Sequence, residues 1–142
     1  MQQKPTLLLM KGLPCSGKTE WALRWVAGKH NRVRVSWTDI LKSIGRKSRD
    51  RRLLAFETAI HLMLQALKNG FDVVLDECNL SGYAVGLFIA RAQMAGADIE
   101  WHTMDISAEE GKRRNAAAGH PVEDMEIDRL AKVYDLWLKQ QG

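Results

Sequence analysis

A chain of 142 residues, 46% of them hydrophobic and 27% charged, has the composition of a globular protein and the length of one domain with a sizeable core. Its net charge of +4 is a mild basic excess, which is compatible with a polyanionic partner but is too small to indicate one. No apolar run is long enough to span a membrane and the N-terminus lacks the apolar stretch of a signal peptide, so we expect a cytoplasmic protein that does not bind membranes.

The first predicted element is a short apolar strand over residues 5–11, which leads into a glycine-rich segment. Residues 12–19, Gly-Leu-Pro-Cys-Ser-Gly-Lys-Thr, have the pattern G-x-x-x-x-G-K-[ST] of a phosphate-binding loop (Walker A). A helix is predicted from Lys18 to about Lys29, so strand, loop and helix come in the order that the motif needs. The alternative, a glycine-rich turn without a ligand, does not require that order.

The loop predicts a site for a nucleoside triphosphate. Two glycines allow a tight turn in which backbone N–H groups converge on phosphate oxygens, and the positive end of the following helix adds to this attraction. Lys18 can reach the β- and γ-phosphates, and the Thr19 hydroxyl can bind Mg²⁺. The expected ATP contacts come from Gly12, Pro14, Cys15, Ser16, Gly17, Lys18 and Thr19.

The rest of the chain alternates between strand and helix patterns. Further strands are predicted over residues 32–36, 71–75 and 98–105, and further helices from about residue 38, over 53–67 and 81–95, from a capping box at 107–110, and over 123–140. This alternation predicts an α/β fold in which helices cover both faces of a parallel sheet. We expect a P-loop three-layer sandwich with about four parallel strands and a short helical lid.

Two acidic residues are predicted at the carboxyl ends of strands, where ligands bind such sheets. Asp39 follows the second strand and could take the proton of an acceptor hydroxyl, although an Asp here can also cap a helix. Lys42 lies one helical turn further on and could hold an acceptor phosphate. Asp76 ends the third strand, which is the pattern of water-mediated Mg²⁺ binding after a phosphate loop, and Glu77 is the other candidate for that role.

Basic residues and cysteines give weaker indications. Arg113 and Arg114 lie on the predicted lid helix; one could close over the phosphates, but helix neighbours point about 100° apart, so we do not expect both to do so. A solvated helix face is the alternative. Residues 46–52 could follow a nucleic-acid backbone, although a lone basic stretch is more often a solvated loop. Cys15 and Cys78 form no metal-binding pattern, and we expect two reduced thiols.

These motifs resemble the 5′-kinase domain of the bacteriophage polynucleotide kinases, within the wider family of small P-loop kinases. Residues 12–19 are close to that family's Gly-x-Pro-x-Ser-Gly-Lys-Ser/Thr, and Trp21-Ala22 follows it similarly. Asn79-Leu80 matches the Asn-Leu after the family's third-strand acid, and residues 110–115 are similar to its lid helix, with a lid arginine at Arg114.

The resemblance implies a single P-loop kinase domain over residues 1–142. Such a domain would transfer the γ-phosphate of ATP to the 5′-hydroxyl of DNA or RNA, as in nucleic-acid repair, with ATP and Mg²⁺ as cofactors. Its partners would be a nucleoside triphosphate and a nucleic-acid 5′-hydroxyl end. The 3′-phosphatase that is fused to some relatives has no counterpart in this sequence.

The sequence departs from the family at the catalytic base. The family base is the first of two adjacent acids and is followed three residues later by arginine, and a gapless match places Thr38 and Leu41 at these positions. Threonine cannot act as a base at neutral pH. A shift of one residue places Asp39 and Lys42 there instead, and we expect this register because the mechanism requires an acid.

Two further departures concern the metal and the lid. Glu77 takes the place of the third-strand acid in the gapless match, and Asp76 takes it in a shifted one. Ala118 replaces a second lid arginine, a role that Arg113 could fill. These departures leave two alternatives to a polynucleotide kinase: a P-loop kinase for a small-molecule or modified-base hydroxyl, and a nucleotide-binding protein that has lost catalysis.

Overall fold

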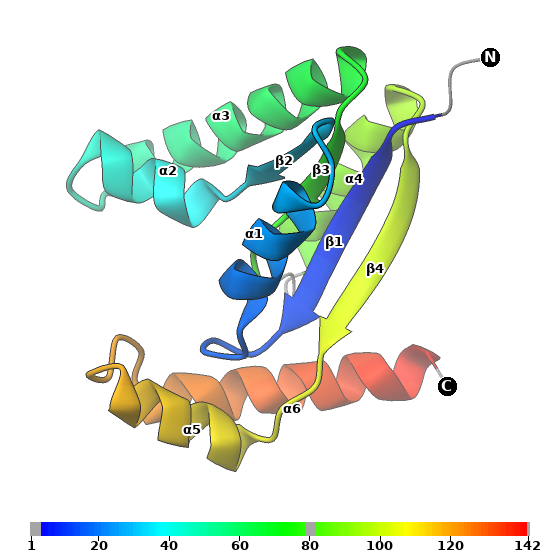
Figure 1. The fold of residues 1–142 in the computed structure, drawn as a ribbon. Coiled ribbons are helices and arrows are strands. Elements are labelled where there is room, and N and C mark those ends of the chain that lie inside the picture. Colours follow the sequence, from blue (N-terminus) through cyan, green and yellow to red (C-terminus); the bar gives the residue numbers. More distant parts are fainter. Residues whose placement is uncertain (1–3, 79–81, 142) are drawn as a thin grey trace.

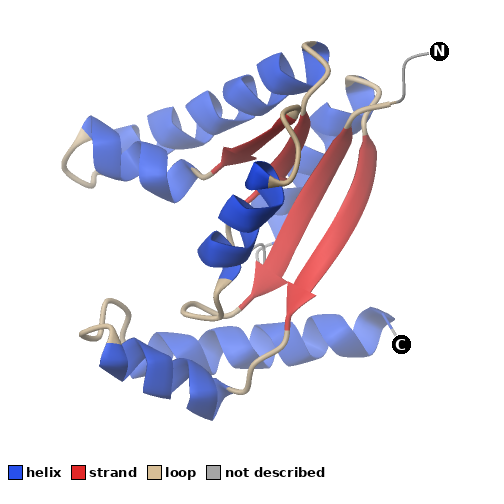
Figure 2. Cartoon of the chain, in the orientation of Figure 1, coloured by secondary structure: helices blue, strands red, loops and turns tan. Residues whose placement is uncertain are grey.

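The computed structural model describes residues 4–78 and 82–141, and these form a four-stranded parallel sheet between helices (Figure 1, Figure 2). Along the sheet the strands follow the order β2-β3-β1-β4. Their bounds are β1 (Thr6–Gly12), β2 (Arg32–Val35), β3 (Asp72–Leu75) and β4 (Asp98–Met104). The phosphate-loop strand β1 is therefore central, with Leu8 opposite Val74 on one side and Glu100 on the other.

Helices cover both faces of this sheet, as the alternating sequence pattern predicts. They are α1 (Lys18–Ala27), α2 (Trp37–Ile44), α3 (Arg49–Lys68), α4 (Gly82–Met94), α5 (Ala108–Ala117) and α6 (Asp124–Gln141). Helix α1 lies on the face opposite α3 and α4, and the α5–α6 pair crosses below the carboxyl ends of β1 and β4 (Figure 1). The predicted P-loop three-layer architecture is confirmed.

The core is divided by the pleat of β1, whose residues point alternately to the two faces. Leu7 and Leu9 pack toward α3 and α4, in a cluster that includes Met63 and Phe88. Leu8 and Met10 pack with Ala22 of α1 on the other face. Since both faces of β1 are buried, its continuous apolar run is explained, and the loop that follows it starts from a strand that is packed on both sides.

Lys11 is an exception within this buried strand. Only 3% of the residue is exposed, and its Nζ lies 4.0 Å from the ring centre of Trp137 and 4.9 Å from that of Trp101. Burial lowers the pKa of the Lys11 ammonium to about 8. The aromatic faces of the two tryptophans partly replace the water that this charge has lost.

The largest difference from the predicted elements is the start of α3. The helix begins at Arg49, not at Leu53, because the Ser48 Oγ caps it by accepting a 3.1 Å hydrogen bond from the backbone N–H of Arg51. Residues 49–52 of the basic stretch 46–52 are therefore helical. Leu53 is 57% exposed, and the buried stripe consists of Ala55, Ala59, Met63, Ala66 and Leu67. Small residues on that stripe allow α3 to approach the sheet closely.

Other predicted boundaries agree within two residues, except that the expected start of α4 at Ser81 lies outside the described residues. The Ser107 cap of the predicted capping box is confirmed, since the Ser107 Oγ accepts a hydrogen bond from the Glu110 N–H at 3.0 Å, whereas the Glu110 carboxylate accepts from Arg113 and Arg114. Among the described helices, none combines the length and the apolar character that crossing a bilayer requires.

Candidate active site

The segment between β1 and α1 makes the tight turn that the sequence predicts. Cys15 and Gly17 have φ angles of 64° and 92°, in the left-handed region that glycine adopts at little cost. At Gly12 the limit is space, because a Cβ atom there would lie 3.0 Å from both the Cβ and the carbonyl oxygen of Met104 on β4. Gly17 is therefore required by its backbone angle, and Gly12 by the close approach of β4.

Lys18 turns its side chain back into this loop. Its Nζ donates hydrogen bonds to the carbonyl oxygens of Leu13 at 2.7 Å and Gly12 at 3.3 Å, and 8% of the residue is exposed. The Ser16 Oγ is buried in the same loop without a hydrogen-bond partner. Over the loop lies a hollow of about 400 Å³, lined by Cys15, Gly17, Lys18, Thr19, Glu20, Arg114 and Ala118. An ammonium and an unsatisfied hydroxyl beside such a hollow fit phosphate oxygens.

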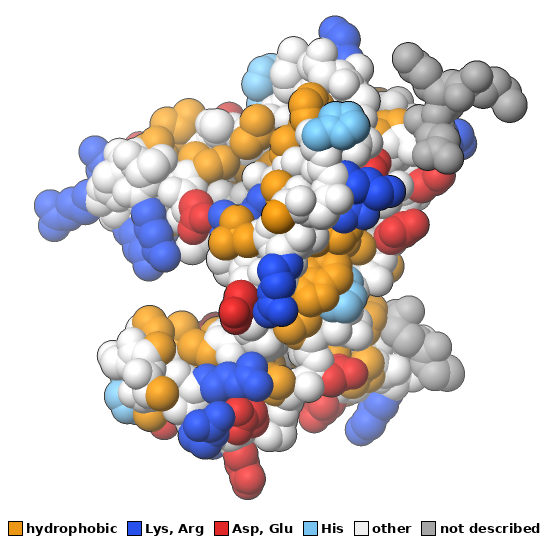
Figure 3. Space-filling view, viewed as in Figure 1, with side chains coloured by type: hydrophobic (Ala, Val, Ile, Leu, Met, Phe, Trp, Pro, Cys, Tyr) orange, Lys and Arg blue, Asp and Glu red, His pale blue; other side chains and the backbone are white. Residues whose placement is uncertain are grey.

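The hollow is open to solvent on the side of the molecule that lies between the α2–α3 hairpin and the α5–α6 pair (Figure 3). In space-filling view the surface is indented between the α2–α3 end and the α5–α6 pair (Figure 3). The phosphate loop lies at this indentation in the ribbon view (Figure 1). A ligand can therefore reach the loop without any rearrangement of the sheet.

Arg34 on β2 joins the two acidic residues that were predicted at strand ends. Its nitrogens lie 2.8 and 2.7 Å from the Asp76 Oδ2 and 2.6 Å from the Asp39 Oδ2. The Asp76 side chain is 2% exposed, so its charge depends on this partner, whereas that of Asp39 is 52% exposed. One guanidinium thus holds two carboxylates at the carboxyl end of the sheet, and Asp39 is the one that solvent reaches.

Glu77 fastens the start of α2 to the end of β3. Its carboxylate accepts hydrogen bonds from the Thr38 backbone N–H at 2.9 Å, from the Thr38 hydroxyl at 2.8 Å and from the Ser36 hydroxyl at 3.0 Å. Burial raises the pKa of the Glu77 carboxyl, against the opposing effect of these hydrogen bonds. Ser36 also caps α2, since its Oγ accepts from the Asp39 N–H at 3.2 Å. Thr38 is therefore occupied with Glu77, while the Asp39 side chain faces Arg34.

The lid helix α5 brings only one of its two candidate arginines to the loop. Arg114 lines the hollow over the phosphate loop, and Arg113 does not. Both donate to the Glu110 carboxylate, which lowers the pKa of that group. Asn115 is fully buried; its amide oxygen accepts from the Val122 N–H at 3.2 Å and lies 3.8 Å from the Cys15 Sγ. Asn115 therefore ties the α5–α6 turn to the phosphate loop.

A second cavity, of about 460 Å³, lies between α2 and α3. It is lined by Trp37, Thr38, Leu41, Lys42, Lys47, Arg52, Ala55, Phe56 and Ala84. Its floor is apolar and its rim is basic. Lys42, which was predicted to hold an acceptor phosphate, is part of this rim, and the cavity shares α2 with Asp39.

The oxygen ligands near the loop fit Mg²⁺ in combination with a nucleotide. Both Arg34 nitrogens that contact Asp76 use Oδ2, so Oδ1 is not used by Arg34. Thr19 is exposed beside the loop. In the described part of the chain no three acidic, His or Cys side chains cluster as a metal site, so further ligands would have to be phosphate and water oxygens, which Mg²⁺ prefers.

Cys15 and Cys78 are both free, as predicted. Burial raises the pKa of the Cys78 thiol, and the nearby Lys18 ammonium opposes this rise. Asn79-Leu80, part of the resemblance to the phage kinases, lies outside the described residues.

Sequence reasoning missed Arg34 and Asn115. Arg34 is one of two arginines alternating with valines on a short strand, and that pattern gave no reason to single it out. Asn115 falls inside a polar helix where burial was not expected. The sequence signal for Asn115 was its position just before the Ala-Ala-Ala-Gly end of that helix. A buried side-chain amide there can form hydrogen bonds with backbone groups of the following turn.

Comparison with known proteins agrees with this geometry. The family described as an AAA domain matches residues 7–136. The chain is similar in structure to a chain of the Pnkp1/Rnl/Hen1 RNA repair complex, with a TM-score of 0.86 and 22% identity over 100% of this chain and 47% of that chain. A second structure of the Pnkp1/Rnl/Hen1 complex gives a TM-score of 0.72 and 26% identity over 80% of this chain and 40% of that chain.

A kinase of a small molecule is also similar in structure. The APS kinase CysC of Mycobacterium tuberculosis, in complex with AMPPNP and APS, matches with a TM-score of 0.62 and 19% identity, over 84% of this chain and 77% of that chain. The chain spans less than half the length of the RNA-repair chains that it matches. No protein with a curated description matches it significantly. With a family match across the sheet, the phosphate loop and the lid, the chain belongs to the AAA domain family and has the fold of the nucleotide-binding P-loop kinases.

Proposed function

We propose that this domain is a polynucleotide 5′-kinase, which transfers the γ-phosphate of ATP to the 5′-hydroxyl of a nucleic acid. The observation that carries the proposal is the Arg34 bridge between Asp39 and Asp76. Because β3 lies between β2 and β1, this bridge is next to the phosphate loop at one end of the sheet. A base and a phosphate donor are needed in such proximity for in-line transfer.

On the donor side, the loop residues and Lys18 would hold the triphosphate, and Arg114 would cover it from the lid. Thr19 and Asp76 are the residues that would hold Mg²⁺, the latter through water. A magnesium ion there would neutralise charge on the phosphates. The phage-type lid pattern has a second arginine, and Arg113 would take that role only if α5 turned, because Arg113 does not line the hollow over the loop.

On the acceptor side, Asp39 would act as the base. Arg34 contacts its Oδ2 and fixes the orientation of the carboxylate, which leaves Oδ1 to receive the proton. The acceptor oxygen attacks the γ-phosphorus, the bond from this phosphorus to the bridging oxygen breaks, and ADP leaves with the electron pair as Asp39 takes the hydroxyl proton. Lys42 would hold the acceptor from the rim of the α2–α3 cavity.

Two observations favour a nucleic acid as acceptor. The strongest structural similarity described above is to a chain of an RNA repair complex. The α2–α3 cavity has Lys42, Lys47 and Arg52 among its lining residues and no acidic residue, which suits an acceptor that carries phosphates. A small phosphorylated acceptor would share this chemistry, so the test must separate the two.

The test supplies γ-labelled ATP with a 5′-hydroxyl oligonucleotide, the same oligonucleotide bearing a 5′-phosphate, and a set of small alcohols. We expect label on the 5′-hydroxyl strand alone. Asp39→Asn should reduce the rate by about 10²–10⁴-fold, the contribution of a general base. Asp98→Asn is the matched control, because Asp98 is exposed at the opposite end of the sheet. Transfer only to a small alcohol, or ATP binding without transfer to anything, would overturn the proposal.

A further inference from the structure

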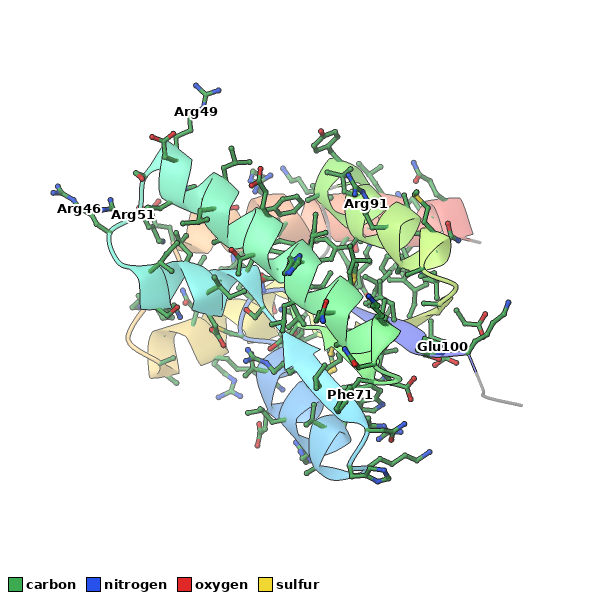
Figure 4. All side chains as sticks on the ribbon, turned by 90° about the horizontal axis from the view of Figure 1, so that it is seen from above. Arg46, Arg49, Arg51, Phe71, Arg91 and Glu100 are labelled. Atoms are coloured by element: carbon green, nitrogen blue, oxygen red, sulfur yellow. The ribbon has the colours of Figure 1, made fainter. Side chains whose placement is uncertain are left out.

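The end of the α2–α3 hairpin carries an unusual density of positive charge. Between residues 46 and 52 there are five cations, Arg46, Lys47, Arg49, Arg51 and Arg52, and one acid, Asp50. All five cationic side chains are exposed. Arg46, Arg49 and Arg51 point outward from this end of the molecule, away from the sheet (Figure 4). Basic side chains also project from this end in the space-filling view (Figure 3).

These cations lack the carboxylate partners that five of the seven other arginines in the chain have. Arg24, Arg34, Arg113, Arg114 and Arg129 each form an ion pair with a carboxylate. Within residues 4–78 and 82–141, no ion pair or side-chain hydrogen bond is formed by the five cations of the hairpin end. The surface is therefore locally uncompensated, which raises the concentration of polyanions around it.

The hairpin end is continuous with the candidate acceptor site. Lys47 and Arg52 belong both to the basic stretch and to the rim of the α2–α3 cavity, where Lys42 and Thr38 are their neighbours. Asp39 follows Thr38 on α2, and the helix axis runs from there toward the hairpin end. Helix α2 ends at Ile44, so at about 1.5 Å per residue it carries the chain roughly 8 Å from Asp39 before Arg46, a span of about two nucleotides at 3.4 Å each.

We infer that Arg46, Arg49 and Arg51 form a track for the backbone of the acceptor strand, beyond the nucleotide whose 5′-hydroxyl is phosphorylated. This inference rests on the proposed function and adds to it the acceptor's minimum length, because none of these three arginines lines the α2–α3 cavity, so a mononucleotide held in that cavity does not contact them. Arginine on an exposed helix start suits phosphate, since its guanidinium binds phosphate oxygens in pairs and is weakly hydrated. Contacts to phosphate carry no base preference, so we expect dependence on length and salt and not on sequence.

The experiment compares the triple variant R46E/R49E/R51E with the parent on acceptors that range from a nucleoside 3′-phosphate to a single strand of about 12 nucleotides. Glutamate is tolerated in the first turn of a helix, so α3 should still form in this variant. The matched control is K4E/K29E/K132E, which makes the same change in net charge at exposed lysines elsewhere. Kinetics are measured as kcat/KM, and binding by the fluorescence anisotropy of a 3′-labelled strand at increasing KCl.

For the parent and the control variant, we expect kcat/KM to rise at least about tenfold between the mononucleotide and a strand of about four nucleotides. In the triple variant this advantage should shrink to about twofold. The slope of log affinity against log salt should become shallower by about 2, because three phosphate contacts of about 0.7 each are lost.

The outcomes separate this inference from the proposed function. Equal length dependence and salt slope in the parent and the triple variant, with active kinase, would overturn the track and leave the kinase. Salt-dependent strand binding that the triple variant loses, without phosphorylation by any variant, would retain the track and overturn the kinase. An equal loss in the control variant would show that overall charge, not the hairpin end, attracts the strand, and this too would overturn the track.

Discussion

The two sides of the proposed active site, with the phosphate loop on the donor side and α2 on the acceptor side, are held in position in different ways. On the donor side, Lys18 is fixed by backbone carbonyl oxygens of Gly12 and Leu13, and the loop follows the central strand of the sheet. On the acceptor side, α2 is held both by charged side chains, through Arg34 and Glu77, and by the packing of Trp37 and Ile40 against the core. The donor side therefore depends on backbone geometry that few substitutions alter, whereas on the acceptor side the substitution of one charged residue removes part of what positions α2.

The largest effect that this comparison predicts is on catalysis by Lys18→Met. Methionine retains most of the side-chain volume but cannot donate to a phosphate, so phosphoryl transfer should fall by about 10²–10³-fold, as for the loss of one preorganised donor. The free energy of unfolding should change little, because the loss of two hydrogen bonds to backbone carbonyls is offset by removal of the cost of burying an ammonium. Single-turnover kinetics and urea unfolding measure both. A Lys18→Met protein that unfolds readily would mean that the donor side also depends on a side chain.

Arg34→Leu should have the converse effect, on stability first. The Asp76 side chain would remain buried without its counter-charge, and breaking a buried pair costs about 3 kcal/mol. The KM for the acceptor should rise more than the KM for ATP, since α2 loses one of its attachments and Asp76 loses its partner. Urea unfolding and separate titrations of ATP and acceptor measure this. The double variant R34L/D76N should recover much of the stability, and failure to recover would place the cost elsewhere.

Asn115→Ala tests whether the α5–α6 turn, like the phosphate loop, is held in place by hydrogen bonds with backbone groups. Removal of the amide leaves the Val122 N–H and carbonyl oxygen without their buried partner, at a cost of about 1–2 kcal/mol. Hydrogen exchange in the α5–α6 turn should accelerate, and the KM for ATP should rise more than the KM for the acceptor. Gln93→Ala, an exposed position on α4, is the control. Unchanged exchange in the turn would contradict the role of Asn115 as its anchor.

The smallest effect on catalysis is expected at Lys11, the other buried lysine near the loop. Its pKa is lowered from 10.5 to about 8, so between these values the unfolded chain binds more protons than the folded one. Stability should therefore rise with pH from about 8 to about 10.5 by this contribution, and Lys11→Met should remove the rise. The measurement is the difference in unfolding free energy between parent and variant at each pH, which cancels other titrating groups. A difference that stays constant with pH would show that the Lys11 ammonium is not desolvated.

The features that the sequence predicted correctly depend on local backbone geometry, and those that it missed depend on contacts between separate elements. The loop, the helix start at Lys18 and the Ser107 cap depend on local backbone rules, and the structure agrees with them. Arg34 could not be singled out because its role needs β2 to lie beside β3, which only the strand order reveals. The early start of α3 was missed because a run of arginines has no apolar period, although Ser48 is a typical cap.

The position of β2 at the margin of the sheet has a consequence for how such a domain can diversify. Among the described residues this strand pairs only with β3, and the stretch from residue 32 to residue 68 contains β2, α2 and α3 without passing through β1, β4 or the loop. One contiguous segment of the gene thus encodes most of the surface that would bind the acceptor in the proposed function. Recombination could exchange that segment between enzymes and leave the phosphate loop and its strand unchanged.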